Sequence, residues 1–99
     1  MWIVANINSN QISTFKDSVK SCNPDNTEFY FPKIIFKINK QYKTKNLLGN
    51  YIFCFNKHFN YNKVKSLKYL KGLNYFLENS FFNQKDIKSF IKLCKSFED

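Results

Sequence analysis

Aromatic and β-branched residues gather in four short runs of this 99-residue chain: residues 2–7, 28–38, 51–55 and 73–77. Residues of these kinds favour extended backbone because their side chains pack well on a pleated surface. Pro32 interrupts the second run, and since proline has no N–H to donate to a ladder, we expect it at a sheet edge or a bulge. The chain is therefore constrained to build a β-sheet from strands that are far apart in sequence.

Three other stretches carry apolar residues at the spacing of an α-helix, which gives each helix one apolar face. Those residues are Ile12, Phe15, Val19 and Cys22; Val64, Leu67 and Leu70; and Ile87, Phe90, Ile91, Cys94 and Phe97. Residues 23–26 predict the turn that ends the first helix. Asn60 or Asn62 can cap the second helix, and Gly72 fits the left-handed position after it. The lysine-rich residues 39–45 indicate a solvated hairpin, and residues 47–50 a further turn.

In chain order these elements read β-α-β-β-β-α-β-α, which predicts an α+β fold in which an antiparallel sheet packs with three helices, an elaborated ferredoxin-like sandwich. The apolar content of 43% and aromatic content of 19% are enough for one core. A chain of this length is typical of one domain. We therefore expect residues 1–99 to form a single domain.

Charge indicates what kind of partner such a domain could bind. All sixteen basic side chains are lysines, against seven acidic ones, so the net charge is +9 at pH 7. An excess of lysine favours salt-dependent attraction to phosphates. It does not favour readout of base sequence, because guanine is read best by the planar fork of arginine, which the chain lacks.

The residues that enzymes and metal sites need are sparse. His58 is the one histidine and lies in a polar stretch, and Cys22, Cys54 and Cys94 are far apart with no C-x-x-C pair. This pattern predicts neither a disulfide framework nor a zinc site. We expect a protein without enzymatic activity, cofactor or metal. No apolar run approaches the roughly 20 residues of a membrane span, so we expect no membrane partner. Since the cysteines suggest no disulfide framework and no targeting segment is evident, we expect a cytoplasmic protein. We also expect a monomer.

Three segments together resemble the N-terminal domain of the NusG family of transcription elongation factors. Residues 2–4 (WIV) are similar to that family's W-Y-hydrophobic start. Residues 31–32 (FP) and, after the hairpin, residues 48–53 (LGNYIF) match its F-P-G-Y-hydrophobic-hydrophobic motif. Residues 50–53 (NYIF) are nearer to the F-P-N-Y-L-F of the antiterminator branch typified by RfaH. Residues 71–76 (KGLNYF) resemble the basic-G-V-x-x-F segment.

The resemblance implies an NGN-type sandwich, as the family's N-terminal domain is called. It also implies docking on the clamp helices of the largest subunit of RNA polymerase, through an apolar depression. The positions that match this depression are Leu48, Tyr51, Phe53, Ile87 and Phe90. Leu48 and Gly49 depart from the motif, because the family has an aromatic residue and a proline there. If the resemblance holds, Leu48, Phe53 and Phe90 lie close together and are partly exposed.

The resemblance also assigns the lysines and a second polymerase contact. The lysines that match the side facing the non-template DNA strand are Lys16, Lys20, Lys68 and Lys71. Those of the hairpin that points toward upstream DNA are Lys37, Lys40, Lys43 and Lys45. Asn62 and Lys63 match a contact to the opposite jaw of the polymerase. Family members continue into a small KOW β-barrel. The 99 residues of this chain contain no KOW domain, so we expect either a stand-alone NGN-like module or one piece of a longer gene product.

Two function classes follow from these observations. The first is a NusG-like transcription elongation or antitermination factor that binds RNA polymerase and suppresses pausing or termination. The second is a small basic module that binds single-stranded nucleic acid. In that module, the aromatic residues of 29–31 and 51–55 would form an exposed platform on which bases stack.

Overall fold

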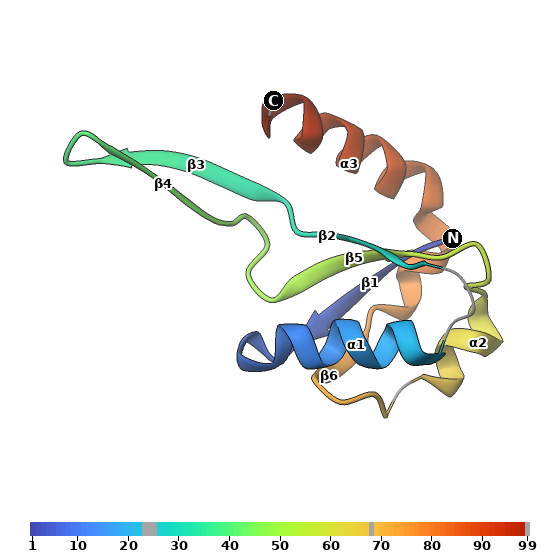
Figure 1. Ribbon diagram of the computed structural model, residues 1–99. Helices are drawn as coiled ribbons and strands as arrows, with labels where there is room; N and C mark the ends of the chain where they lie inside the picture. Colours follow the sequence, from blue (N-terminus) through green and yellow to red (C-terminus); the bar gives the residue numbers. More distant parts are fainter. Residues whose placement is uncertain (23–25, 68, 99) are drawn as a thin grey trace.

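The computed structural model describes residues 1–22, 26–67 and 69–98, and it shows an α+β protein with antiparallel sheets and three α-helices (Figure 1). The predicted turn at residues 23–26 lies mostly outside the described residues. The strands are β1 (Trp2–Ile7), β2 (Glu28–Tyr30), β3 (Lys33–Ile38), β4 (Gln41–Asn46), β5 (Tyr51–Phe55) and β6 (Leu73–Phe76). The helices are α1 (Ile12–Cys22), α2 (Tyr61–Ser66) and α3 (Gln84–Glu98), with 3-10 turns η1 (Ser9–Gln11) and η2 (Glu78–Asn83).

The main sheet has the order β2-β5-β1-β6, with every neighbouring pair antiparallel. Strands β5 and β1 are central, and they are covered on both faces. Helix α1 lies on one face and α3 lies on the other (Figure 1). The alternation of side chains along a strand therefore divides the apolar residues into two cores.

One core lies under α1 and α2 and the other under α3. The first contains Ile3, Ala5, Ile7, Phe15, Val19, Ile52, Cys54, Phe59, Val64 and Leu67. The second contains Trp2, Val4, Phe53, Ile87 and Ile91. The pairing of β1 with β5 sets this division, because it places Ile3 opposite Cys54 and Val4 opposite Phe53. The predicted double-sided burial of the first strand is thus confirmed.

The single strand predicted over residues 28–38 is wrong, because the structure has two strands there, β2 and β3. The break falls at Phe31 and Pro32, where the backbone leaves the main sheet. Pro32 has no N–H for a ladder, and its carbonyl instead accepts a hydrogen bond from the Leu47 N–H at 2.7 Å. The order between α1 and α2 is therefore four strands, not three.

The second helix is shorter than its apolar spacing predicted. Asn60 caps α2 as expected, since its side chain accepts a hydrogen bond from the Lys63 N–H at 2.8 Å. The helix ends at Ser66 rather than at Leu70. Gly72 has the predicted left-handed conformation (φ +84°), but it packs on the start of α1, where an added Cβ would lie 2.8 Å from the Gln11 carbonyl oxygen.

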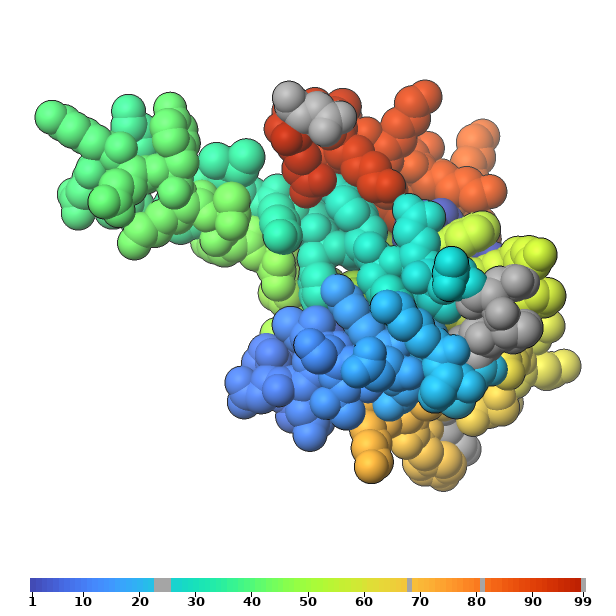
Figure 2. All heavy atoms as spheres, viewed as in Figure 1, coloured from blue at the N-terminus to red at the C-terminus, as the bar shows by residue number. Residues whose placement is uncertain are grey.

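Strands β3 and β4 form a two-stranded hairpin that projects from the body of the molecule (Figure 2). Its turn residues, Asn39 and Lys40, both have positive φ, at 50° and 67°. Two such residues in a two-residue loop match the right-handed twist of a hairpin. The predicted lysine-rich hairpin is confirmed, and its strands are longer than residues 39–45.

The first half of β1 lacks a strand partner on the β6 side, because β6 pairs only with residues 5–7. Two side chains from η2 and α3 replace that partner. Gln84 accepts a hydrogen bond from the Trp2 N–H at 2.8 Å, and its Nε2 donates to the Trp2 carbonyl at 2.6 Å. Ser80 Oγ accepts from the Val4 N–H at 3.3 Å. These bonds hold the start of α3 against the sheet.

We expect Gln84→Ala to destabilise the fold by about 1–3 kcal/mol, because the partly buried Trp2 N–H and carbonyl would lose their partners. The measurement is urea unfolding, with the exposed Gln11→Ala as the matched control. A loss for Gln84→Ala no greater than that of Gln11→Ala would show that these bonds do not hold α3.

Candidate functional site

An apolar groove of about 480 Å³ lies between α3 and the end of the sheet, and we call it the α3 groove. It is lined by Val4, Leu48, Tyr51, Phe53, Leu77, Asp86, Ile87 and Phe90. All five residues that the sequence assigned to polymerase docking are in this set. The structure therefore brings together residues from a turn, a central strand and the C-terminal helix.

The floor of the groove is set by strand register. Val4 and Phe53 are directly opposite each other on β1 and β5, so their side chains share the face toward α3. From α3, Ile87 packs into the second core, and Phe90 lies beside it at the next turn of the helix. The ring of Phe90 contacts that of Phe53, with 5.9 Å between their centroids.

The opposite wall comes from the turn before β5 and from the end of β6. Gly49 has a φ of +62°, which lets the chain turn sharply between Leu48 and Tyr51. The Tyr51 hydroxyl is 2.8 Å from that of Tyr75, which joins this wall to β6. This hydrogen bond is the main reason why the pKa of Tyr75 is raised.

We expected Leu48, Phe53 and Phe90 to lie close together and to be partly exposed. Leu48 and Phe90 meet this expectation, and Phe53 is buried. Leu48 is 38% exposed and Phe90 is half-buried. Phe53, however, is only 4% exposed, because Phe90 and Tyr30 pack against it. Phe53 is therefore the base of the groove, and Leu48, Tyr51 and Phe90 offer the accessible surface.

Among the described residues that line the groove, one is charged. This is Asp86, in the first turn of α3, and the other described lining residues present hydrocarbon or aromatic surface apart from the Tyr51 hydroxyl. A partner that fills this groove must therefore bring apolar side chains. A cationic side chain of the partner, next to those apolar side chains, could form an ion pair with the Asp86 carboxylate.

Three of the four lysines assigned to the non-template strand lie within the described residues, and the fourth, Lys68, lies outside them. Lys16 is half-buried, with its ammonium 5.7 Å from the ring centre of Phe29. Lys20 and Lys71 are exposed. Because Gly72 packs on the start of α1, Lys71 lies beside that helix end.

The hairpin carries five lysines and no acidic residue between residues 33 and 46. Its register places Lys43 opposite Phe36, and Lys45 opposite Ile34, on one face. Lys37 lies on the other face, opposite Tyr42, which is 76% exposed. Lys40 is at the tip. All four lysines assigned to upstream DNA are therefore exposed, on a ribbon that leads away from the body (Figure 2).

Asn62 and Lys63 lie on α2, which packs against the sheet face opposite the α3 groove. Asn62 is exposed. Lys63 is half-buried, and its ammonium donates to the Cys22 carbonyl at 3.2 Å. The groove and this predicted second contact are therefore on different faces of the molecule.

The rings that would form the stacking platform of the alternative function are mostly covered by other side chains of the protein. Trp2 covers Phe55, with 5.3 Å between ring centroids, and Phe15 lies edge-on to Phe29 at 6.1 Å. Tyr30 packs on Phe53. These rings are half-buried or buried, so they leave little surface on which bases could stack.

The histidine and the cysteines, which are potential catalytic or metal-binding residues, differ in their exposure. His58 is exposed, and Cys54 is buried under α1, where burial raises the pKa of its thiol and the charge of Lys16 opposes part of that effect. Within residues 1–22, 26–67 and 69–98, no three His, Cys, Asp or Glu side chains could hold one metal ion. No helix in the described part of the chain is long and apolar enough to cross a membrane.

Sequence reasoning missed three lining residues of the α3 groove, namely Val4, Leu77 and Asp86. The alternation of the first strand could have shown that Val4 and Trp2 share a face. Nothing in the sequence places Leu77 at this edge, because its position depends on the bulge in the pairing of β6 with β1.

Comparisons with known proteins give no match. No protein family, curated protein or solved structure among those compared is similar enough to this chain to count as a relative.

The thiols give a direct check of the buried core. We expect a thiol reagent at mildly alkaline pH to modify Cys22 first, because it is exposed. Cys94 should react more slowly, since partial burial and the charge of Glu98 raise the pKa of its thiol and leave less thiolate. Cys54 should react only after unfolding. Mass spectrometry of the labelled chain over time measures this order, and early labelling of Cys54 would contradict the packing of α1 on the sheet.

Proposed function

We propose that this chain is a NusG-like transcription elongation factor of the antiterminator type, without enzymatic activity. It binds the clamp helices of the largest subunit of RNA polymerase in the α3 groove. Its lysines contact the non-template strand and upstream DNA. In this proposal the protein bridges the polymerase cleft, holds the clamp closed and steadies upstream DNA, so that pausing and termination become less frequent.

The observation that carries the proposal is the convergence of five residues. Leu48, Tyr51, Phe53, Ile87 and Phe90 were assigned from the resemblance of the sequence to the family, and they come from two segments about 35 residues apart in the chain. They line one apolar groove. Apolar surface of this kind, with aromatic side chains at its rim, is what a helical partner requires.

The order of the elements supports an NGN-type fold. If the hairpin β3–β4 is set aside, the chain from β1 to β6 reads β-α-β-β-α-β, the order of the ferredoxin-like fold. Helix α3 then adds a layer on the face opposite α1 and α2, and the α3 groove forms along its edge.

The bridging mechanism needs contacts on separate parts of the surface. The α3 groove lies on one face of the sheet, and Asn62 and Lys63 lie on α2 at the other. The hairpin projects from the body, and the molecule with its hairpin extends 47 Å along its longest axis (Figure 2). This separation allows the polymerase and upstream DNA to be contacted at the same time.

Phe90→Ala should weaken binding to an isolated clamp-helix fragment by about 10–150-fold. A buried phenylalanine at an interface contributes roughly 1.5–3 kcal/mol, and each 1.4 kcal/mol is about tenfold in affinity. The contact is apolar, so added salt should change the loss little. Isothermal titration calorimetry at low and high salt measures it.

The matched control is Phe97→Ala, because Phe97 lies on the same helix, is 79% exposed and does not line the groove. Thermal melting shows whether either variant is unfolded. If folded Phe90→Ala binds the fragment as tightly as Phe97→Ala does, the α3 groove is not the docking site.

Replacing Lys43 and Lys45 together by glutamine should reduce the salt dependence of binding to duplex DNA. Each phosphate contact contributes about 0.9 to the slope of log affinity against log salt, so the slope should fall by about 1.8. The measurement is fluorescence anisotropy of labelled duplex DNA at several salt concentrations. Lys85→Gln, on α3, should leave this slope unchanged, and equal slopes for all three proteins would remove the hairpin from the DNA interface.

A further inference from the structure

Helix α3 carries a row of lysines that no part of the proposed site uses. Lys85, Lys88, Lys92 and Lys95 are spaced i, i+3, i+7 and i+10, so they lie along one side of the helix. The row spans about 15 Å, since each residue of a helix adds 1.5 Å. Lys88 and Lys92 lie roughly 160° around the helix from Phe90, which puts them on the flank opposite the α3 groove.

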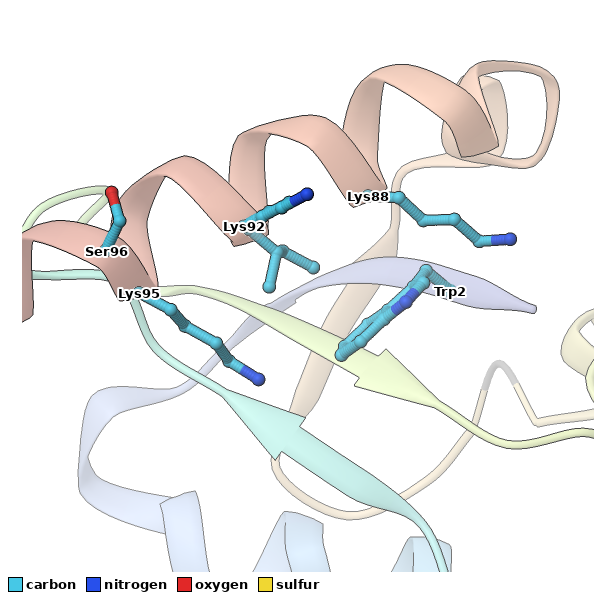
Figure 3. A pocket seen from close by; sticks show the side chains of 6 residues that line it. Trp2, Lys88, Lys92, Lys95 and Ser96 are labelled. Atoms are coloured by element: carbon cyan, nitrogen blue, oxygen red, sulfur yellow. The ribbon is translucent and has the colours of Figure 1, made fainter.

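Three of these lysines border a second hollow, of about 420 Å³, which we call the Trp2 hollow (Figure 3). It is lined by Trp2, Lys88, Ile91, Lys92, Lys95 and Ser96. Figure 3 shows Lys88 and Lys95 extending from α3 on either side of the Trp2 ring. The hollow is therefore basic at its rim and apolar at its floor.

The floor of the Trp2 hollow is held in place by ring packing and by backbone hydrogen bonds. Trp2 is 8% exposed and packs on Phe55, and its backbone N–H and carbonyl are both bonded to the side chain of Gln84. Ile91, from the second core, lies beside it. A ligand in the hollow thus meets a fixed aromatic edge and an aliphatic side chain, whereas the lysines above it can adjust.

The lysines at the rim of the Trp2 hollow differ in whether an acidic side chain pairs with them. Lys95 forms an ion pair with Glu28 at 3.4 Å, and its ammonium lies 5.1 Å from the ring centre of Tyr30. Lys88 and Lys92 are exposed and form no ion pair with another described residue. Partial burial lowers the pKa of the Met1 amino group, and the positive charge of Lys88 lowers this pKa further. Two lysines are therefore available for an anion.

We propose that the Trp2 hollow binds the backbone of a single-stranded nucleic acid, with Lys88 and Lys92 each pairing with a phosphate. These two residues are one helical turn apart, about 6 Å along the axis, and a flexible strand can match such a row. Single-strand sites combine a basic track with aromatic and apolar surface, and Trp2 and Ile91 supply that surface. The hollow lies between a helix and a sheet, so a strand fits it better than a duplex.

This contact is separate from those of the proposed function. Of the lysines assigned to the non-template strand, Lys16, Lys20 and Lys71 lie on or beside α1, on the other sheet face. Those assigned to upstream DNA lie on the hairpin. The α3 groove and the Trp2 hollow occupy opposite flanks of α3, so both can be filled at once. Binding of a single strand to the Trp2 hollow can be measured without polymerase. Strand binding in the hollow and polymerase docking in the α3 groove can therefore fail independently.

Trp2 is the one tryptophan of the chain, so its fluorescence reports directly on the hollow. We would titrate the whole protein with a short oligothymidylate and a short oligouridylate at several salt concentrations. Both strands should change the Trp2 emission in a saturable way, and added salt should weaken the binding. For single strands each phosphate contact contributes about 0.7 to the salt slope. Lys88→Gln and Lys92→Gln should therefore each lower the slope by about 0.7.

Lys85→Gln is the matched control, because Lys85 belongs to the same row but does not line the hollow. It should leave the Trp2 response and the slope unchanged.

Equal slopes for Lys85→Gln, Lys88→Gln and Lys92→Gln, or no change in emission with either strand, would overturn the proposal. An equal response to polyglutamate would assign the hollow to acidic peptides, and saturation by inorganic phosphate at the same concentration would assign it to a lone anion. Both results also overturn the proposal. Thermal melts check that each variant is folded.

Discussion

Strand β1 is buried on both faces, and the positions of the helices depend on it. Its residues Ile3, Ala5 and Ile7 face α1 and α2, whereas Trp2 and Val4 face α3. A slip of one residue against β5 would exchange these two sets and leave both cores unfilled. Because β6 does not reach the first half of β1, the side chains of Ser80 and Gln84 complete its hydrogen bonds, and this fixes where α3 begins.

The position of α3 in turn creates two surfaces of different chemistry. One flank of the helix, at Phe90, borders the apolar α3 groove, and the other, at Lys88 and Lys92, borders the basic Trp2 hollow. The floors of the two surfaces are formed by successive residues on one face of β1, since Val4 lies under the groove and Trp2 under the hollow. A change that displaces α3 should therefore disturb both surfaces together, whereas substitutions at the two flanks should act separately.

Elements whose apolar residues recur with a strong period were predicted from the sequence. Features that depend on hydrogen bonds between distant segments were missed. The apolar spacing found α1 and α3, and the aromatic runs found β1, β5 and β6, the last with one residue too many at its end. The division at Pro32 was missed because a run of β-branched residues does not show where a strand leaves its sheet. The grouping of Leu48 with Phe90 came from motif resemblance, and the alternating pattern alone could not have given it. The lysine row of α3 was visible in the sequence, but only the packing of Trp2 beneath it suggests a site.

We propose that the α3 groove binds the clamp helices of RNA polymerase, and an NMR titration of the isotopically labelled chain with an unlabelled clamp-helix fragment, without nucleic acid, tests this binding directly. The backbone amide signals of Leu48, Tyr51, Ile87 and Phe90 should shift on binding, while those of α1 and of the hairpin β3–β4 should stay in place. The absence of any shift at saturating fragment, or shifts confined to α1 and the hairpin, would contradict it.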